Sequence, residues 1–278
     1  MARKTLYERL DNLGVNVYAE YDALMRLIKH EQIIWYSHSY HSVIKYIDNF
    51  YFRKLPAKFR CPFLSVEEMM TAMNLPDISY DLDDLFLLSE LLIAILPLEY
   101  VKQDQDLERQ ALIIRTNIVS FLGKLNYELK VIDEGQVIIV EKNPATTQAV
   151  GIVNDDTTAI DLIKYNHYSM KGNLAEKRRI LTALGSYIEP ILKSRALQNA
   201  GYKQLESDVG FMLNNFHVRH NNKEGAKTQD YIVGLNKKQL EEWYDKIYNA
   251  ILSVIIINEY IPTQNNIAEL KSKYNWRT

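Results

Sequence analysis

The sequence predicts a mostly α-helical protein with an N-terminal helical domain, a β-hairpin and a C-terminal helical bundle. Three observations lead to this prediction. Apolar residues recur at helical spacing along most of the chain. Only 10 Gly and 7 Pro interrupt the 278 residues, which favours long unbroken helices over a many-stranded sheet. A hydrophobic fraction of 47% and a charged fraction of 24% are typical of a folded globular chain.

Size, charge and cysteine content narrow the class of protein further. A chain of this length is expected to form roughly two units of about 100 to 170 residues each. The formal net charge of −2 is not that of a strongly basic nucleic-acid-binding domain, so any contact with RNA or DNA should be local. A single cysteine, Cys61, and an N-terminus without a signal-peptide pattern favour a reducing cytoplasm. The longest apolar run, 251–257, is too short to span a membrane.

The first third of the chain has a continuous helical pattern. Helical periodicity from residue 5 to about 54 predicts three helices, of which the second covers 18–30 and the third 32–52. His38 and His41 would then lie three residues apart on one helix face. Two histidines without a third ligand nearby make a weak metal signal, so we predict no metal site here.

The next segments are separated by proline and by capping residues. Ser65 followed by Glu68 is a capping-box signal for the start of a helix. Further helices are expected over 66–74, 81–96 and 107–124, after a loop at 55–62.

A change of period from helical to alternating marks the segment 127–141. Alternating apolar residues, a turn containing glycine and a β-branched run predict a β-hairpin. A helix followed by a hairpin also occurs in winged-helix DNA-binding domains, in which Arg109, Arg115 and Lys124 would face phosphates. A hairpin that connects two helical domains is the other interpretation. The chain therefore divides into an N-terminal domain, 1–100, a connector of helix and hairpin, 101–150, and a C-terminal bundle, 151–278.

The C-terminal bundle is expected to contain four helices. A helix from Asp155 would carry His167 on its packed face, and Pro190 should kink or end the helix that follows. The last helix is apolar on more than one side, which is typical of a bundle centre or a dimer interface, and Pro262 should end it. The four helices are expected near 155–170, 173–191, 205–216 and 236–261, with a short terminal helix beyond.

The densest group of chemically active side chains lies between Phe211 and Lys227, in the segment FMLNNFHVRHNNKEGAK. His217, Arg219 and His220 fall within four positions, directly after an apolar helical pattern. Two histidines can transfer protons near neutral pH, and a fixed arginine cation can stabilise an anion. We therefore take these three residues as the candidate catalytic residues, at the C-terminal end of a helix.

The same stretch also has a purely structural interpretation. Polar and cationic side chains at a helix C-terminus bind its open carbonyl groups and complement the helix dipole. Asn221 or Asn222 can take the left-handed conformation of a helix cap. Both interpretations stay open at the level of sequence. The candidate binding residues beside the cluster are four amides, Asn214, Asn215, Asn221 and Asn222.

The segment from about Asp155 to Tyr260 resembles the HEPN superfamily: a helical hairpin, a third helix that ends in a short polar motif with His, and a long apolar helix. Together with the preceding hairpin and the N-terminal helices, the chain resembles the abortive-infection HEPN proteins of bacterial phage defence. The resemblance implies a metal-independent endoribonuclease without a cofactor, a homodimer, and a cytoplasmic role in phage defence or a toxin–antitoxin system. Its partners would be RNA and an antitoxin or defence protein.

The family motif is Arg, four to six residues, then His, and His220 matches the motif histidine. The upstream positions at that spacing are occupied by Phe216, Asn215 and Asn214. Arg219 would therefore act from a displaced position, with His217 as a second proton carrier and the neighbouring amides as orienting groups. The implied mechanism has His assist attack of the ribose 2′-hydroxyl on the phosphodiester, while Arg stabilises the developing charge. A non-catalytic HEPN-like binding or regulatory module is the alternative.

Overall fold

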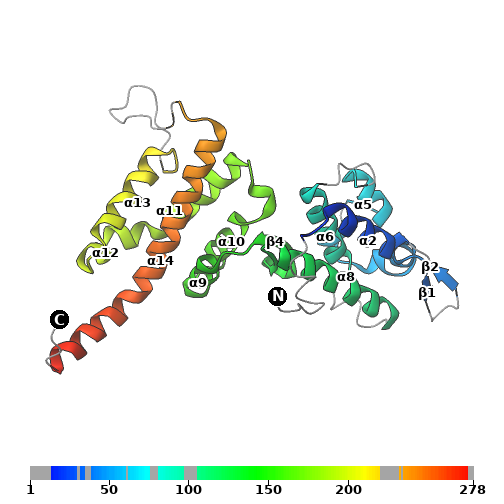
Figure 1. The fold of residues 1–278 in the computed structure, drawn as a ribbon, viewed down its shortest axis with the longest axis horizontal. Helices are drawn as coiled ribbons and strands as arrows, with labels where there is room; N and C mark the ends of the chain where they lie inside the picture. Colours follow the sequence, from blue (N-terminus) through cyan, green and yellow to red (C-terminus); the bar gives the residue numbers. More distant parts are fainter. Residues whose placement is uncertain are drawn as a thin grey trace, which may run out of the picture. The chain divides into compact units, whose positions relative to one another are not determined.

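The computed structural model describes residues 14–29, 32–34, 39–60, 62–75, 81–96, 105–219, 232 and 234–274, and most of these are helical, as predicted (Figure 1). The chain separates into two compact units, Met1–Glu141 and Lys142–Thr278. The boundary falls just after the second hairpin. The finer division into 1–100, 101–150 and 151–278 stays a prediction.

The described part of the N-terminal unit consists of helices packed around a buried, leucine-rich helix, with two hairpins. In chain order its elements are α2 (Val17–Lys29), β1 (Gln32–Ile34), β2 (Ser39–His41), α3 (Val43–Tyr46), the π-helix η1 (Ile47–Tyr51), the 3₁₀ turn η2 (Phe52–Lys54), α4 (Ala57–Arg60), α5 (Val66–Ala72), α6 (Leu82–Ile95), α8 (Gln105–Lys124), β3 (Tyr127–Val131), the 3₁₀ turn η3 (Asp133–Gly135) and β4 (Val137–Glu141).

The prediction of a helix over residues 32–52 is wrong for the first half of that range. β1 and β2 pair antiparallel with Gln32 opposite His41, and helical structure begins only at Val43. His41 therefore lies in a strand, and its proposed partner on a helix face, His38, is outside the described residues. Short runs of β-branched and aromatic residues fit either period over a few positions, so pairing between strands decided the outcome.

Helix α6 is the centre of the N-terminal unit. Asp81 and Asp84 form a reciprocal capping box that starts α6. The helix is buried on most sides and packs against α2, α4, α8 and β4. Strand β4 is held to it by a hydrogen bond from the backbone N–H of Ile139 to Oε1 of Glu90, at 2.7 Å. The hairpin predicted at 127–141 is confirmed, with Tyr127 opposite Glu141.

The C-terminal unit is a bundle built around two long helices. Its elements are α9 (Pro144–Ile152), α10 (Asp156–Tyr165), the 3₁₀ turn η4 (Tyr168–Met170), α11 (Leu174–Lys193), α12 (Ala196–Asn199), α13 (Lys203–Asn215) and α14 (Lys237–Lys273). Helix α14 packs against α9, α11, α12 and α13. Figure 1 shows α14 running the length of this unit.

Three details of this unit differ from the prediction. Helix α9 was not predicted. Pro144 lies in its first turn, where a proline favours the start of a helix, and the side chain of Asn143 caps that turn. Helix α10 ends at Tyr165, so His167 caps the turn η4 and does not lie on a helix face. Helix α14 continues through Pro262 to Lys273. Within the described residues, none of the helices is both long and apolar enough to cross a membrane.

Candidate functional site at the end of helix α13

The predicted cluster lies in a tight turn that ends helix α13. The backbone N–H of Phe216 still donates to the carbonyl of Met212, at 3.1 Å. His217 then takes a left-handed conformation with φ of 57°, and the N–H of Arg219 donates to the carbonyl of Leu213, at 3.0 Å. A left-handed residue after the last turn is the usual way to close a helix C-terminus. The cap conformation expected at Asn221 or Asn222 is thus taken by His217; those two residues and His220 lie outside the described part of the chain.

Two side chains of α11 bind the backbone of this turn. Nε of Arg178 donates to the carbonyl oxygen of His217 at 2.6 Å, and Oγ1 of Thr182 donates to the carbonyl oxygen of Val218 at 2.8 Å. A carbonyl at a helix end needs such a partner, and an arginine there also complements the negative end of the helix dipole. The turn is therefore tied to a neighbouring helix at successive residues.

A glycine on the same face of α11 lets α13 come close. A Cβ atom added at Gly185 would lie 3.2 Å from Cδ2 of Leu213 and 3.9 Å from Cγ1 of Val218. Arg178, Thr182 and Gly185 are spaced i, i+4, i+7, so they share one side of the helix. None of the three was predicted, although their shared face beside the apolar stripe of α11 is a pattern that could have identified them.

The predicted side chains have different surroundings in the structure. Arg219 is half-buried; its Nη2 lies 3.5 Å from the carbonyl oxygen of Gly185, and its Nε is buried with no hydrogen-bond partner among the described atoms. His217 is also half-buried. Asn215 donates to the carbonyl of Phe211 in its own helix, at 2.7 Å, and Asn214 is exposed. The structure thus brings His217 and Arg219 together with Arg178.

Helix α14 adds a buried phenol to this region. Burial raises the pKa of the Tyr244 hydroxyl, and the nearby positive charge of Arg178 opposes part of that rise. The phenol is therefore protonated at neutral pH and can act as a hydrogen-bond donor. One residue earlier along the chain, the ring of Trp243 packs on Phe216 with centroids 4.7 Å apart. Helices α11, α13 and α14 therefore all contribute side chains to the region of the turn.

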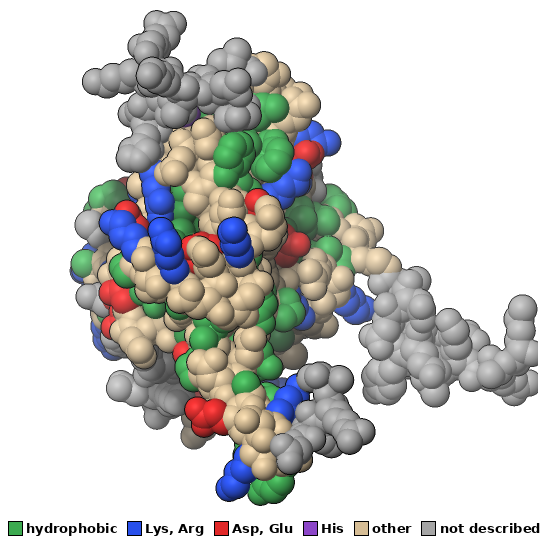
Figure 2. Space-filling view, turned by 90° about the vertical axis from the view of Figure 1, so that its left-hand side faces the viewer, with side chains coloured by type: hydrophobic (Ala, Val, Ile, Leu, Met, Phe, Trp, Pro, Cys, Tyr) green, Lys and Arg blue, Asp and Glu red, His purple; other side chains and the backbone are tan. Residues whose placement is uncertain are grey.

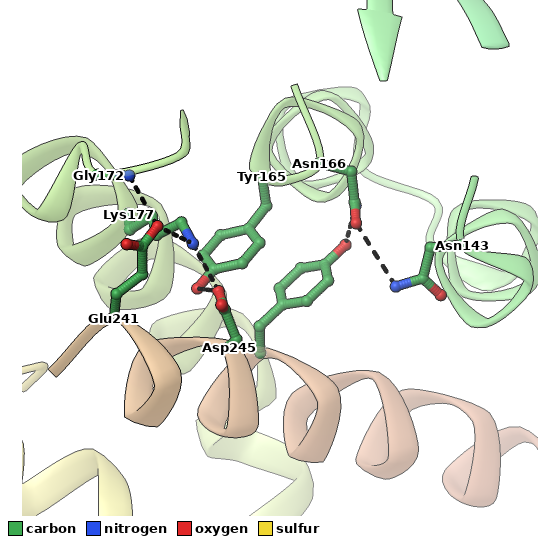
Figure 3. Close-up of polar contacts among 8 residues, drawn as sticks. Asn143, Tyr165, Asn166, Gly172, Lys177, Glu241 and Asp245 are labelled. Carbon is green, nitrogen blue, oxygen red and sulfur yellow. Dashed lines mark hydrogen bonds and ion pairs between the residues drawn. The ribbon is translucent and has the colours of Figure 1, made fainter. Parts of the chain in front are cut away.

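A second polar cluster lies between α10, α11 and α14 (Figure 3). Nζ of Lys177, a residue only 6% exposed, lies 2.7 Å from Oδ1 of Asp245 and 2.9 Å from Oε1 of Glu241. Figure 3 shows Lys177 between the two carboxylates, with the hydroxyl of Tyr165 directed at Asp245. Burial alone would raise the pKa of Glu241, but hydrogen bonds from the N–H of Gly172 and from Lys177 outweigh it and lower the pKa.

This cluster continues through a pair of stacked tyrosines. The rings of Tyr165 and Tyr248 lie 4.0 Å apart and nearly parallel. Burial raises the pKa of Tyr248 to about 12, although hydrogen bonds with Thr146 and Asn166 work against the rise. Its hydroxyl also donates to the carbonyl of Leu162, at 2.8 Å. Because the charges and polar atoms in this cluster bind one another, we assign it to the stability of the bundle.

Charge differs between the two units. Residues 142–278 contain 18 Lys and Arg against 14 Asp and Glu, whereas residues 1–141 contain 15 against 21. The face shown in Figure 2 carries Lys and Arg side chains with Asp and Glu among them. The negative excess of the N-terminal unit disfavours the winged-helix interpretation of α8 and the β3–β4 hairpin, because binding to DNA depends on cations that face phosphates.

Neither a search for metal-binding groups nor comparison with known proteins assigns a function to this site. Among the described residues, no group of three or more His, Cys, Asp or Glu side chains is placed to hold a metal ion. Comparisons with protein-family models, with curated proteins and with solved structures found no match to this chain.

Proposed function

We propose that the C-terminal unit is a metal-independent endoribonuclease of the HEPN type, with the turn after α13 as its active site. One observation carries the proposal: the fold gathers His217, Arg219 and Arg178 at one helix end, directly before His220. A cationic site with titratable histidines suits the phosphodiester of RNA. The positive excess of residues 142–278 supports the same substrate.

The proposed reaction is an internal transfer within the RNA. A histidine, His220 or His217, removes the proton of a ribose 2′-hydroxyl, whose oxygen then attacks the adjacent phosphorus. The bond from phosphorus to the 5′-oxygen breaks, and the second histidine returns a proton to that oxygen. Arg219 stabilises the charge that develops on the phosphoryl oxygens. The products are a 2′,3′-cyclic phosphate and a free 5′-hydroxyl.

The environment of the protein forms part of the same proposal. We place it in the cytoplasm as a homodimer, in a phage-defence or toxin–antitoxin setting with an antitoxin or defence partner. The amides Asn214, Asn215, Asn221 and Asn222 would contact the RNA chain near the cleaved bond.

A specific observation favours the second candidate, a non-catalytic binding or regulatory module. His217 closes the helix, and Arg178 donates to the backbone of that residue. Both residues therefore already have structural roles at the turn. In this alternative the cationic turn binds RNA or a partner protein and no bond is broken.

The deciding experiment is cleavage of total cellular RNA by the purified full-length protein in the presence of a chelator. We expect cleavage by the wild type and its loss in His220→Ala and Arg219→Ala, with both variants shown to be folded by circular dichroism. Gln204→Ala, a change of an exposed residue near the start of α13, is the matched control and should cleave like the wild type. RNA that stays intact but is retained by the wild type, and not by Arg219→Ala, would replace the nuclease with the binding module.

A further inference from the structure

The last part of α14 extends beyond the core of the C-terminal unit. The helix has 37 residues, which corresponds to about 55 Å, yet its buried residues end at Ile255. Gln264 still contacts the unit, because its Nε2 donates to the carbonyl of Ala200 at 3.2 Å. Every residue from 265 to 274 is exposed. Figure 1 shows this red end of α14 projecting past α12, and we call residues 256–274 the arm.

One face of the arm carries an apolar seam with the spacing of a coiled coil. Four large side chains on it are 39 to 72% exposed. The intervals between seam positions alternate between four and three residues, which keeps them on one face of two helices that wind around each other. The seam positions are Ile256, Tyr260, Thr263, Ile267, Leu270 and Tyr274.

The arm has little to stabilise it as an isolated helix. Pro262 removes one backbone hydrogen bond inside it, and a proline in a helix interior costs about 3 kcal/mol. Twelve residues follow this proline up to Tyr274, and helices shorter than about 12 to 15 residues are marginal in water. The arm nevertheless stays helical up to Lys273, so its exposed apolar seam is a surface suited to be covered by another helix.

We propose that the arm pairs antiparallel with the same arm of a second copy of this chain. The positions of the charged residues beside the seam favour this antiparallel pairing with an identical arm. Glu259 and Lys273 both flank the seam on one side, with Asn266 midway between them. An antiparallel twofold pair places Glu259 of each copy opposite Lys273 of the other and brings the two Asn266 side chains together. A parallel pair would instead place Glu259 beside Gln264, so it forms no such ion pair.

Antiparallel packing also fits the sizes of the seam residues. Tyr260 faces Leu270 of the second copy, Ile267 faces Thr263, and Tyr274 faces Ile256. A large side chain thus meets a smaller one in each layer, which fills the seam without overlap. The pairing uses residues far along the chain from the α13 turn, so it holds whether or not the turn cleaves RNA.

The first test is the mass of the full-length protein in solution, measured by light scattering over a wide range of concentration. We expect a dimer that becomes a monomer in the double variant Ile267→Asp with Leu270→Asp. The matched control, Asn265→Asp with Ser272→Asp, adds the same charge on the opposite face and should stay dimeric. A monomeric wild type, or a dimer that survives the seam variant, would overturn the proposal.

The second test addresses orientation. Glu259→Lys should weaken the dimer severalfold, and adding Lys273→Glu in the same chain should restore it. In a Cys61→Ser background, Asn266→Cys should form a disulfide between copies under mild oxidation, whereas Glu259→Cys should not. Failure of the charge reversal to restore pairing, or disulfide formation by Glu259→Cys alone, would contradict the antiparallel register. RNA cleavage measured on the same samples reports separately on the α13 turn.

Discussion

The buried ion cluster of α11 and α14 allows a quantitative prediction. Lys177 is almost fully buried, whereas the side chain of Asp245 is 47% exposed and that of Glu241 is 20% exposed. When an ion pair in this cluster is broken, water can therefore hydrate the two carboxylates more easily than the ammonium group of Lys177. Removing both carboxylates leaves an ammonium group in the bundle interior, and breaking a buried ion pair in this way costs about 3 to 5 kcal/mol.

The double variant Glu241→Gln with Asp245→Asn should lie near the lower end of this range, at about 3 kcal/mol, because the amide oxygens still accept hydrogen bonds from Lys177. Lys177→Met should cost less, about 1 to 2 kcal/mol, since both carboxylates then gain water and keep other donors, the N–H of Gly172 and the hydroxyl of Tyr165. The double carboxylate variant should therefore lose more stability than Lys177→Met. If the lysine charge itself supplied the stability, Lys177→Met would lose at least as much.

Hydrogen exchange of the full-length protein, followed on peptides of α11 by mass spectrometry, measures these changes without assuming that both units unfold together. Lys193→Met is the matched control, because Lys193 forms an exposed i, i+4 pair with Glu189 and should change the opening free energy by less than about 0.5 kcal/mol. A Lys177→Met variant that is as mild as Lys193→Met, or that costs more than the double carboxylate variant, would contradict this account of the ion cluster.

Two further predictions concern the same bundle. The lowered pKa of Glu241 stabilises the fold above the ordinary carboxyl value of 4.5, and this contribution disappears as the pH falls through the folded-state pKa. Urea denaturation between pH 3 and 7 should therefore show less acid destabilisation in Glu241→Gln, and an unchanged pH profile would count against the cluster. Gly185→Val should destabilise the bundle by about 1 to 3 kcal/mol through overlap with Leu213, whereas Gly210→Val on α13, where a Cβ would meet no neighbour, should be milder. If Gly185→Val and Gly210→Val lowered the thermal midpoint equally, close packing of α11 against α13 would not explain why residue 185 is a glycine.

Helix starts were the most predictable part of this protein. Ser65 was identified from the Glu three positions later, and its side chain caps α5 as expected. Asn173 and Asn236 are likewise followed by Glu or Gln three positions later, and their side chains cap α11 and α14. These signals are local, because the donor and acceptor lie within one turn. Helix stops were less predictable. Pro262 lies inside α14, and the proline at position 144 starts a helix, since a proline's effect depends on which turn contains it.

The candidate site was predictable in its location and not in its surroundings. The sequence placed His217 and Arg219 at the end of a helix, and the structure confirms that location. Arg178 and Thr182 were not identified, although they hold the turn, because they lie 39 and 36 residues away from the carbonyl groups that they bind. No local pattern records which distant carbonyl group a side chain will meet.

The helical class, the β3–β4 hairpin and the position of the His and Arg cluster could be predicted from local patterns, because periodicity, caps and turn residues act within a few positions. The burial of Lys177 between carboxylates of α14 and the close approach of α13 to Gly185 depend instead on how the helices pack. The same packing leaves the end of α14 uncovered within its unit. These features depend on contacts between segments far apart in the chain, and such contacts form only when the helices pack.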